Sequence, residues 1–332
     1  MGDPLYLHHP ECLGHDNGPD HPESPERLRA IEGELARRRW CGYRRCEAPE
    51  VDPAALAAVH GADHLERVMR GGPLDDGETV SGPGSPAAVR RAAGAACELA
   101  RALLVGEAPT GFCAVRPPGH HADADSTWGF CLVNNVAVAA RHPPERLGAR
   151  RVMIVDWDVH HGDGTAAIFR DDPSVLYVSI HQTGVFPGTG ALTEMGAGAG
   201  AGYTVNLPVP AGSDGEVWRS MIEWIVVPVG ERFAPDLILV SAGFDAHRDD
   251  PLAGCALETE DFGELARHVR ALGARVGAPV GAVLEGGYHP PALAASVRAT
   301  MEGLADGRPP ESAPPDFLTE RAAARVAHHW RL

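Results

Sequence analysis

The apolar residues of this chain gather in short continuous runs rather than in an alternating pattern. Six such runs are candidate strands: 111–115, 151–156, 175–180, 203–208, 237–242 and 280–285. Longer stretches rich in Ala, Leu and Arg lie between them and predict helices: 86–105, 215–231 and 260–276. Strands that are apolar on both faces and alternate with helices are typical of a parallel sheet covered on both sides. The pattern therefore predicts an α/β fold with three layers.

The length of 332 residues fits one α/β domain, and no internal repeat is visible. We predict a single domain over residues 1–307. The proline-rich stretch "RPPESAPP" (308–315) predicts a linker, and the residues that follow it predict a C-terminal helix over 316–330.

An excess of acidic residues limits the partners of the chain. There are 45 Asp and Glu against 29 Lys and Arg, which gives a net charge of −16. The longest basic run is the arginine triplet at 37–39, so we expect no direct binding to nucleic acid. An acidic enzyme can still attract cationic substrates such as lysine-rich peptides or polyamines.

Cysteine usage and the N-terminus predict a cytoplasmic protein. The seven cysteines are odd in number and form no C-x-x-C pair, which favours reduced thiols. The opening "MGDPLYLHHPEC" has neither the basic nor the apolar region of a signal peptide, and no apolar run reaches the roughly 18 residues of a membrane span. We expect no membrane partner, and a homo-oligomer is compatible with the sequence.

Titratable side chains cluster where the apolar runs stop. His120 and His121 follow the first run, "DWDVHHGDG" begins at the end of the second, Asp245 follows the fifth and Tyr288 follows the last. In open parallel sheets, ligands bind in the crevice beyond the carboxyl ends of the strands. Four such ends predict one shared site.

The spacing of "DWDVHH" predicts a metal site. Asp156, Asp158 and His160 alternate at period two, so in an extended chain their side chains point the same way. Together with Asp245, the pair Asp158 and His160 gives three ligands and an open position, as in catalytic metal sites. Zinc is the default ion, but the set is rich in oxygen, so Fe²⁺, Co²⁺ or Mn²⁺ can compete.

The two histidines of "GHH" predict proton transfer beside that metal. His120 and His121 each need a carboxylate to fix the tautomer, and Asp156 and Asp163 are the unclaimed acids nearby. Tyr288 can donate a hydrogen bond to a developing oxyanion. These groups are the equipment for metal-assisted amide hydrolysis.

Other residues have simpler interpretations. Asp163 lies in "GDG" and could be a turn residue only. His161 follows a ligand directly, so we expect it to point away and to support the structure, and Glu285 could be a buried partner of backbone groups. Five further histidines are expected to be ordinary polar residues: His8, His9, His142, His328 and His329.

The motifs together resemble a known superfamily. In order, "RPPGHHA", "DWDVHHGDGT", "SIH…FPGTG", "SAGFDAHRDDPLAG" and "EGGY" look like those of histone deacetylases and acetylpolyamine amidohydrolases, in the bacterial class II-like branch. The resemblance spans about residues 5 to 305. It implies the arginase/deacetylase fold, which has an eight-stranded parallel sheet, and zinc ligands at Asp158, His160 and Asp245.

The resemblance also implies roles for the remaining site residues. His121 would be the main general base and acid, with His120 tuning the electrostatics and Tyr288 as the catalytic tyrosine. Asp156 would partner His120, and Asp163 would partner His121. Members often hold a structural potassium ion, and the matching groups are the side chains of Asp156 and Ser179 and the carbonyls of Asp158, His160 and Ile180. A second monovalent site would lie near Phe169 and Val175.

The acyl-lysine tunnel of the family matches further positions. Phe130 and Phe186 match its aromatic walls, Gly129 lies beside the first, and Arg27 matches an arginine near the product-release channel. Two positions depart from the pattern. Glu78 is the nearest match to a loop acid that is usually Asp, and Leu252 stands where eukaryotic polyamine-selective relatives carry Glu.

The sequence thus predicts a zinc-dependent deacetylase for N-acetyl or other short N-acyl amides of lysine side chains or related amines. Several alternatives stay open. One is a small-molecule amidohydrolase of the same fold, acting for example on acetylpolyamines. Another is a non-catalytic acyl-lysine binder. A third is a ureohydrolase with two Mn²⁺ ions, which needs more bridging carboxylates than this chain offers.

Overall fold

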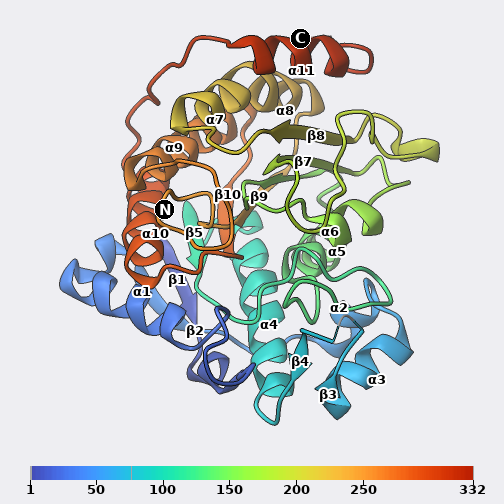
Figure 1. Cartoon of the computed structure of the whole chain (residues 1–332), viewed down its shortest axis with the longest axis vertical. Coiled ribbons are helices and arrows are strands. Elements are labelled where there is room, and N and C mark those ends of the chain that lie inside the picture. Colours follow the sequence, from blue (N-terminus) through green and yellow to red (C-terminus); the bar gives the residue numbers. More distant parts are fainter. Residues whose placement is uncertain (1, 76, 332) are drawn as a thin grey trace.

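The computed structural model describes residues 2–75 and 77–331 (Figure 1). Its centre is an eight-stranded parallel sheet with the order β2-β1-β5-β10-β9-β6-β7-β8. The strands of this sheet are β1 (Leu5–His8), β2 (Arg44–Glu47), β5 (Thr110–Cys113), β6 (Val152–Asp156), β7 (Val175–Gln182), β8 (Thr204–Val209), β9 (Leu237–Ala242) and β10 (Val280–Leu284). A short antiparallel pair, β3 (Gly72–Pro73) and β4 (Val80–Ser81), stands apart from it.

Helices cover both faces of the sheet. The α-helices are α1 (Glu26–Arg37), α2 (Pro53–Ala57), α3 (Ala62–Arg70), α4 (Ser85–Leu104), α5 (Asn135–Leu147), α6 (Asp163–Ile168), α7 (Gly215–Met221), α8 (Val227–Phe233), α9 (Thr259–Val276), α10 (Pro290–Ala305) and α11 (Phe317–Val326). Shorter helical segments are η1 (Pro10–Gly14), η2 (Arg39–Gly42), η3 (Gly198–Gly200) and η4 (Ile222–Val226), the last of which is a π-helix.

Two groups of helices form the outer layers. Helices α4 and α5 pack together against β1, β5, β6, β9 and β10, whereas α1, α9 and α10 pack side by side on the opposite face (Figure 1). The central strands are buried along their whole length, as near-continuous apolar runs require. The predicted three-layer α/β fold with an eight-stranded parallel sheet is therefore confirmed.

The six strands predicted from apolar runs all form, with ends that differ by at most two residues. The pattern did not reveal β1 and β2. Strand β2 reads "RRCE" and lies at the sheet edge, mostly exposed, where charged residues protect against unwanted pairing. The predicted helix 215–231 is divided by η4, and the predicted helix 316–330 is the shorter α11.

The strand order brings the candidate chemistry together. Strands β5, β10, β9 and β6 are consecutive in the sheet, and the predicted site residues follow their carboxyl ends. Register places Asp156 opposite Ser179 on β7 and Ser241 on β9. The C-terminal helix α11 packs near α7, η4 and the edge strand β8. The division of the chain at residue 307 stays a prediction.

Candidate metal centre and active site

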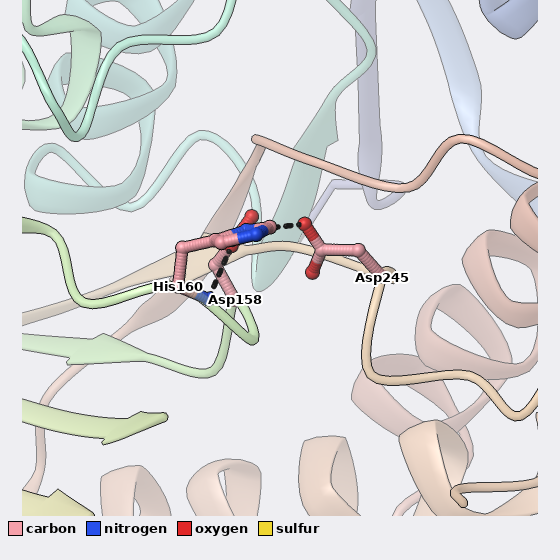
Figure 2. Close-up of side chains that lie close together, drawn as sticks. All are labelled: Asp158, His160 and Asp245. Atoms are coloured by element: carbon pink, nitrogen blue, oxygen red, sulfur yellow. Dashed lines mark hydrogen bonds and ion pairs between the residues drawn. The ribbon is translucent and has the colours of Figure 1, made fainter. Parts of the chain in front are cut away.

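Asp158, His160 and Asp245 form a compact buried cluster at the ends of β6 and β9 (Figure 2). One potential ligand atom from each lies within 4.8 Å of the others. His160 Nδ1 is 3.1 Å from Asp158 Oδ1 and 3.1 Å from Asp245 Oδ2, so the imidazole faces both carboxylates. Within the described residues, this is the one group of His, Cys, Asp or Glu that could hold a metal ion.

Backbone groups hold the two carboxylates in place. The N–H of Gly286 donates to Asp158 Oδ2 at 2.8 Å, and the N–H of Val159 donates to Asp245 Oδ1 at 2.9 Å. A Cβ atom at Gly286 would overlap the carboxylates of both Asp245 and Asp158. Glycine at this position therefore lets the loop after β10 approach the cluster closely.

The donor set fits a divalent cation. Burial lowers the pKa of His160, but its hydrogen bonds with Asp158 and Asp245 outweigh this and raise the pKa to about 10. Two buried carboxylates without compensation would be costly, and a proton on His160 or a cation between the three side chains provides that compensation. One imidazole and two carboxylates suit zinc and also the more oxygen-loving Fe²⁺, Co²⁺ and Mn²⁺.

Each histidine of "GHH" has the carboxylate partner that the sequence predicted. His120 Nδ1 lies 3.0 Å from Asp156 Oδ2, and His121 Nδ1 lies 2.7 Å from Asp163 Oδ1. Asp156 Oδ2 also accepts a hydrogen bond from the Tyr177 hydroxyl at 2.8 Å. In both histidines the carboxylate contacts Nδ1, which leaves Nε2 as the nitrogen for chemistry.

The two histidines differ in their electrostatics. Burial lowers the pKa of His121 to about 4, the proximity of His120 adds to this, and the hydrogen bond that His121 donates to the carboxylate of Asp163 opposes it. Burial also lowers the pKa of His120, but the carboxylates of Asp158 and Asp156 raise it well above its usual value. The pKa shifts of the two neighbouring histidines thus run in opposite directions, and His121 with its lowered pKa is suited to accept a proton.

A cavity of about 300 Å³ adjoins the metal cluster and contains the expected substrate residues. Its lining combines His121, His160 and Tyr288 with Glu78, Gly129, Phe130, Val185, Phe186 and Leu252. The Phe186 ring centroid lies 5.0 Å from that of His121, and the Phe130 centroid lies 6.0 Å from that of Tyr288. All five residues predicted to bind substrate thus line one cavity with His121, Tyr288 and His160.

The glycine between the walls is required by geometry. Gly129 has φ of +52°, and a Cβ atom there would lie 2.5 Å from His121 Cδ2 and 2.7 Å from Phe186 Cε1. Such distances are shorter than real Cβ atoms tolerate, so any side chain would displace the imidazole or the aromatic wall.

Comparison with known proteins decides the family. Residues 21–304 match the family model that is described as "Histone deacetylase domain". The chain belongs to the histone deacetylase family.

The histone deacetylase family relationship extends over most of the chain. Histone deacetylase 15 of Arabidopsis thaliana is 39% identical over 316 residues, which are 91% of this chain and 56% of that protein. A "Probable deacetylase" of Archaeoglobus fulgidus is 37% identical over 337 residues, which are 97% of this chain and 94% of that protein. The crystal structure of the HDA15 HD domain gives a TM-score of 0.92 at 33% identity, and the match covers 99% of this chain and 96% of that one. The chain is therefore a hydrolase of the deacetylase family with a candidate metal site.

The chain spans little more than half of the Arabidopsis relative. Among the described residues, none of the helices combines the length and the apolar character that crossing a membrane requires. The cytoplasmic location stays a prediction.

Glu285 is a partner of backbone groups, as one interpretation of the sequence expected. Its Oε2 accepts the N–H of Gly119 at 2.7 Å and that of His120 at 3.2 Å, and its Oε1 accepts the Ser241 hydroxyl at 3.0 Å. Burial raises the pKa of Glu285 to about 7. This side chain ties the end of β10 to the turn that carries the histidine pair.

Arg27 fixes the backbone of the "EGGY" turn through hydrogen bonds to its carbonyls. It is fully buried, its Nε donates to the carbonyl of Gly287 at 2.7 Å, and its Nη2 donates to the carbonyl of Glu285. The guanidinium carbon lies 5.1 Å from the Tyr288 ring centroid. Glu23 pairs with Arg27 at 3.1 Å and also with Arg116, so one buried carboxylate is shared by two arginines. A role in product release stays a prediction for Arg27.

Asp250 is a site residue that the sequence did not reveal. Its Oδ2 accepts the N–H of Tyr288 at 2.6 Å, and its Oδ1 accepts the N–H of Leu252 at 3.0 Å. The only signal for it was a second acid in "RDDPL", next to a proline that forces a turn. One carboxylate thus joins the loop of the phenol to the rim of the cavity.

The side chains expected at the first potassium site lie on neighbouring strands, and the residues expected near the second line a separate cavity. Asp156 and Ser179 are register partners on β6 and β7, and the Ser179 hydroxyl lies 2.9 Å from His181 Nδ1. Phe169 and Val175 line a separate cavity of about 210 Å³. Potassium itself stays a prediction at both places.

His161 points away from the metal cluster, as expected. It is buried, its Nδ1 lies 2.8 Å from the Thr189 hydroxyl, and its ring centroid lies 4.8 Å from that of His181, with the two rings tilted by 48°. Burial lowers the pKa of His161 to about 2, so it stays neutral and acts in packing.

Proposed function

We propose that this chain is a zinc-dependent deacetylase, which hydrolyses N-acetyl or other short N-acyl amides of lysine side chains or related amines. One observation supports this most directly. A single cavity brings together the neutral base His121, the phenol Tyr288 and the metal-ligand candidate His160 between two aromatic walls. The aliphatic side chain of an acylated lysine fits between such walls, and its acyl carbonyl would reach the polar end.

The candidate metal ligands are Asp158, His160 and Asp245. A divalent ion bound there would act as a Lewis acid toward the acyl carbonyl and the attacking water. Zinc is the proposed ion. Because the three side chains leave open positions, the arrangement is that of a catalytic site rather than a closed structural one.

The side chains of the chain itself would move the protons. His121 accepts a proton from the attacking water at Nε2, because Nδ1 is held by Asp163. The Tyr288 hydroxyl donates a hydrogen bond to the tetrahedral oxyanion as the carbonyl carbon is attacked. His120, which is hydrogen-bonded to Asp156, would tune the electrostatics around this negative charge, and His121 then gives its proton to the leaving amine.

The mouth of the cavity favours an acyl-lysine peptide over a polyamine. Phe186 is 40% exposed and Leu252 and Trp128 are each 38% exposed, so the rim is largely apolar. Leu252 offers no charge to a secondary ammonium. Glu78 is the one acid in the lining among the described residues, so an acetylpolyamine remains the second candidate. Potassium near Asp156 and Ser179 is proposed as a structural ion.

A competition screen tests the proposal. Zinc-loaded protein is given acetyl-lysine peptides, longer acyl-lysines and acetylpolyamines together, and released amines are measured. We expect acetyl-lysine peptides to have the highest kcat/KM. Tyr288→Phe should lower kcat by about 10²-fold or more, the effect of one lost oxyanion donor. Near-wild-type turnover by that variant would exclude the assigned role of Tyr288, and preferential use of polyamines would support the second candidate.

A further inference from the structure

A second cavity, of about 500 Å³, lies beside the cavity of about 300 Å³ that contains His121 and Tyr288. Its walls come from the loop after β7, from the end of β8 and from the C-terminal helix α11. Among the wall residues are the apolar side chains of Leu192, Val209 and Leu318 and the cationic Arg321. None of the roles described above uses this space.

The two cavities share a wall. Val185 and Phe186 line both of them, and Phe186 is 40% exposed between the two. A substrate whose acyl group enters past Phe186 therefore has its remaining part next to the second cavity. Because the two cavities share this wall and one extended residue spans roughly 3.3–3.6 Å, the residues next to the acylated lysine can reach the second cavity.

The charge of the second cavity contrasts with that of the whole protein. The chain carries a net charge of −16, yet within its described part no Asp or Glu lines this cavity. Arg321 is exposed at its edge and forms no ion pair with a carboxylate of the described residues. An unpaired arginine beside apolar walls is suited to an anion attached to an apolar group.

The helix that supplies Arg321 is fixed to the domain. Asp316 caps α11 by accepting the N–H of Thr319 at 2.8 Å, and the Thr319 hydroxyl lies 2.8 Å from that of Ser220 on α7. Ala322 is buried beneath it. The wall of the second cavity is thus held in place by α7 and does not depend on the linker alone.

We propose that the second cavity is a substrate subsite for the residues that flank the acylated lysine. It takes an apolar side chain, and Arg321 pairs with a carboxylate next to that side chain. The inference rests on the proposed function, because it assigns an acylated peptide to the neighbouring cavity. It gives α11 a role in selecting substrates.

The test uses zinc-loaded full-length protein and two kinds of substrate. One is a single acetyl-lysine amide, which cannot reach the second cavity. The other is a peptide series in which glutamate or glutamine beside a leucine is moved through the three positions on either side of acetyl-lysine. We expect wild type to prefer glutamate over glutamine at one position, by about fivefold in kcat/KM, which is the upper range for an accessible ion pair.

Substitutions then locate the effect. Arg321→Ala should remove the glutamate preference through KM, with kcat unchanged and the single acetyl-lysine amide unaffected. Arg321→Glu should favour the same peptide with lysine in place of glutamate. Arg331→Ala makes the same charge change outside the cavity and should keep the preference. Ala191→Trp, at an exposed loop position on the cavity wall, should fill the space and abolish the preference for leucine as well.

The outcomes separate the two proposals. If wild type hydrolyses neither the single acetyl-lysine amide nor any peptide of the series, the proposed activity on acetyl-lysine is wrong. If it hydrolyses these substrates, but Arg321→Ala and Ala191→Trp leave every peptide preference unchanged, the subsite is wrong and the function stands.

Discussion

The carboxylate of Asp250 joins two loops of the active site, since it accepts the N–H of Tyr288 at 2.6 Å and that of Leu252 at 3.0 Å. Asp250→Ala removes both bonds and leaves two partly buried N–H donors without their acceptor, which costs at most about 1–3 kcal/mol each. We expect a lower melting temperature and a fall in kcat of about tenfold or more, because the phenol loses its support.

Two further variants separate positioning from folding in this region. Asp250→Asn keeps one acceptor oxygen and should recover part of kcat. Asp249→Ala removes the neighbouring exposed acid and should behave like wild type in kcat and in melting temperature. Equal effects of Asp249→Ala and Asp250→Ala on kcat would contradict a positioning role for Asp250.

The pKa of His121 predicts the acid side of the pH–rate profile. Burial lowers this pKa to about 4, and a general base must be unprotonated. Since the group is neutral above its pKa, kcat/KM should be flat near neutrality and fall only as the pH drops toward about 4.

Asp163→Asn provides the control for this assignment. The carboxylate of Asp163 raises the pKa of His121, so its removal should shift the acid limb to lower pH. The plateau should fall about tenfold or more, because the imidazole loses the partner that orients it. A limb that moves to higher pH in this variant would show that another group controls the rate.

Gly129→Ala tests the contact between the aromatic wall and the base. The new Cβ would lie 2.5 Å from His121 Cδ2, in addition to the strain of φ at +52°. Gly106→Ala is a matched control, because Gly106 has φ of +73° and no heavy atom within 4 Å of its added Cβ.

Both glycine variants should lose about 1–2 kcal/mol of folding free energy from backbone strain alone. Only Gly129→Ala should also lower kcat/KM by about tenfold or more, as expected when a catalytic group is displaced. Denaturant unfolding and steady-state kinetics measure the two effects. Equal kinetic losses in both variants would mean that the Gly129 contact has no special part in catalysis.

The sequence revealed those parts of the molecule in which local pattern and burial agree. The central strands are buried on both faces and so appear as apolar runs. The D-x-D-x-H spacing predicted that Asp158 and His160 point the same way, and the end of a neighbouring strand added Asp245. Strand β2 was missed because its exposed edge position needs no apolar residues. The role of Asp250 depends on the path of two loops that approach across 38 residues, which no local pattern encodes.

Beyond the candidate metal ligands, some features of the site could be predicted from the sequence and others could not. Carboxylate partners for His120 and His121 could be predicted, because few unclaimed acids lie at that strand end. The second cavity could not be predicted, since it forms where α11 packs beside β8, and these two elements are far apart in the sequence.

Metal dependence of acetyl-lysine hydrolysis is the most direct test of the account. The protein is treated with a chelator, its metal content and its turnover of an acetyl-lysine amide are measured, and zinc is then added back. We predict about one bound zinc per active chain, loss of turnover on chelation and recovery with zinc, while Asp245→Ala neither binds zinc tightly nor recovers. Full turnover by the metal-free protein, or by Asp245→Ala, would contradict the account.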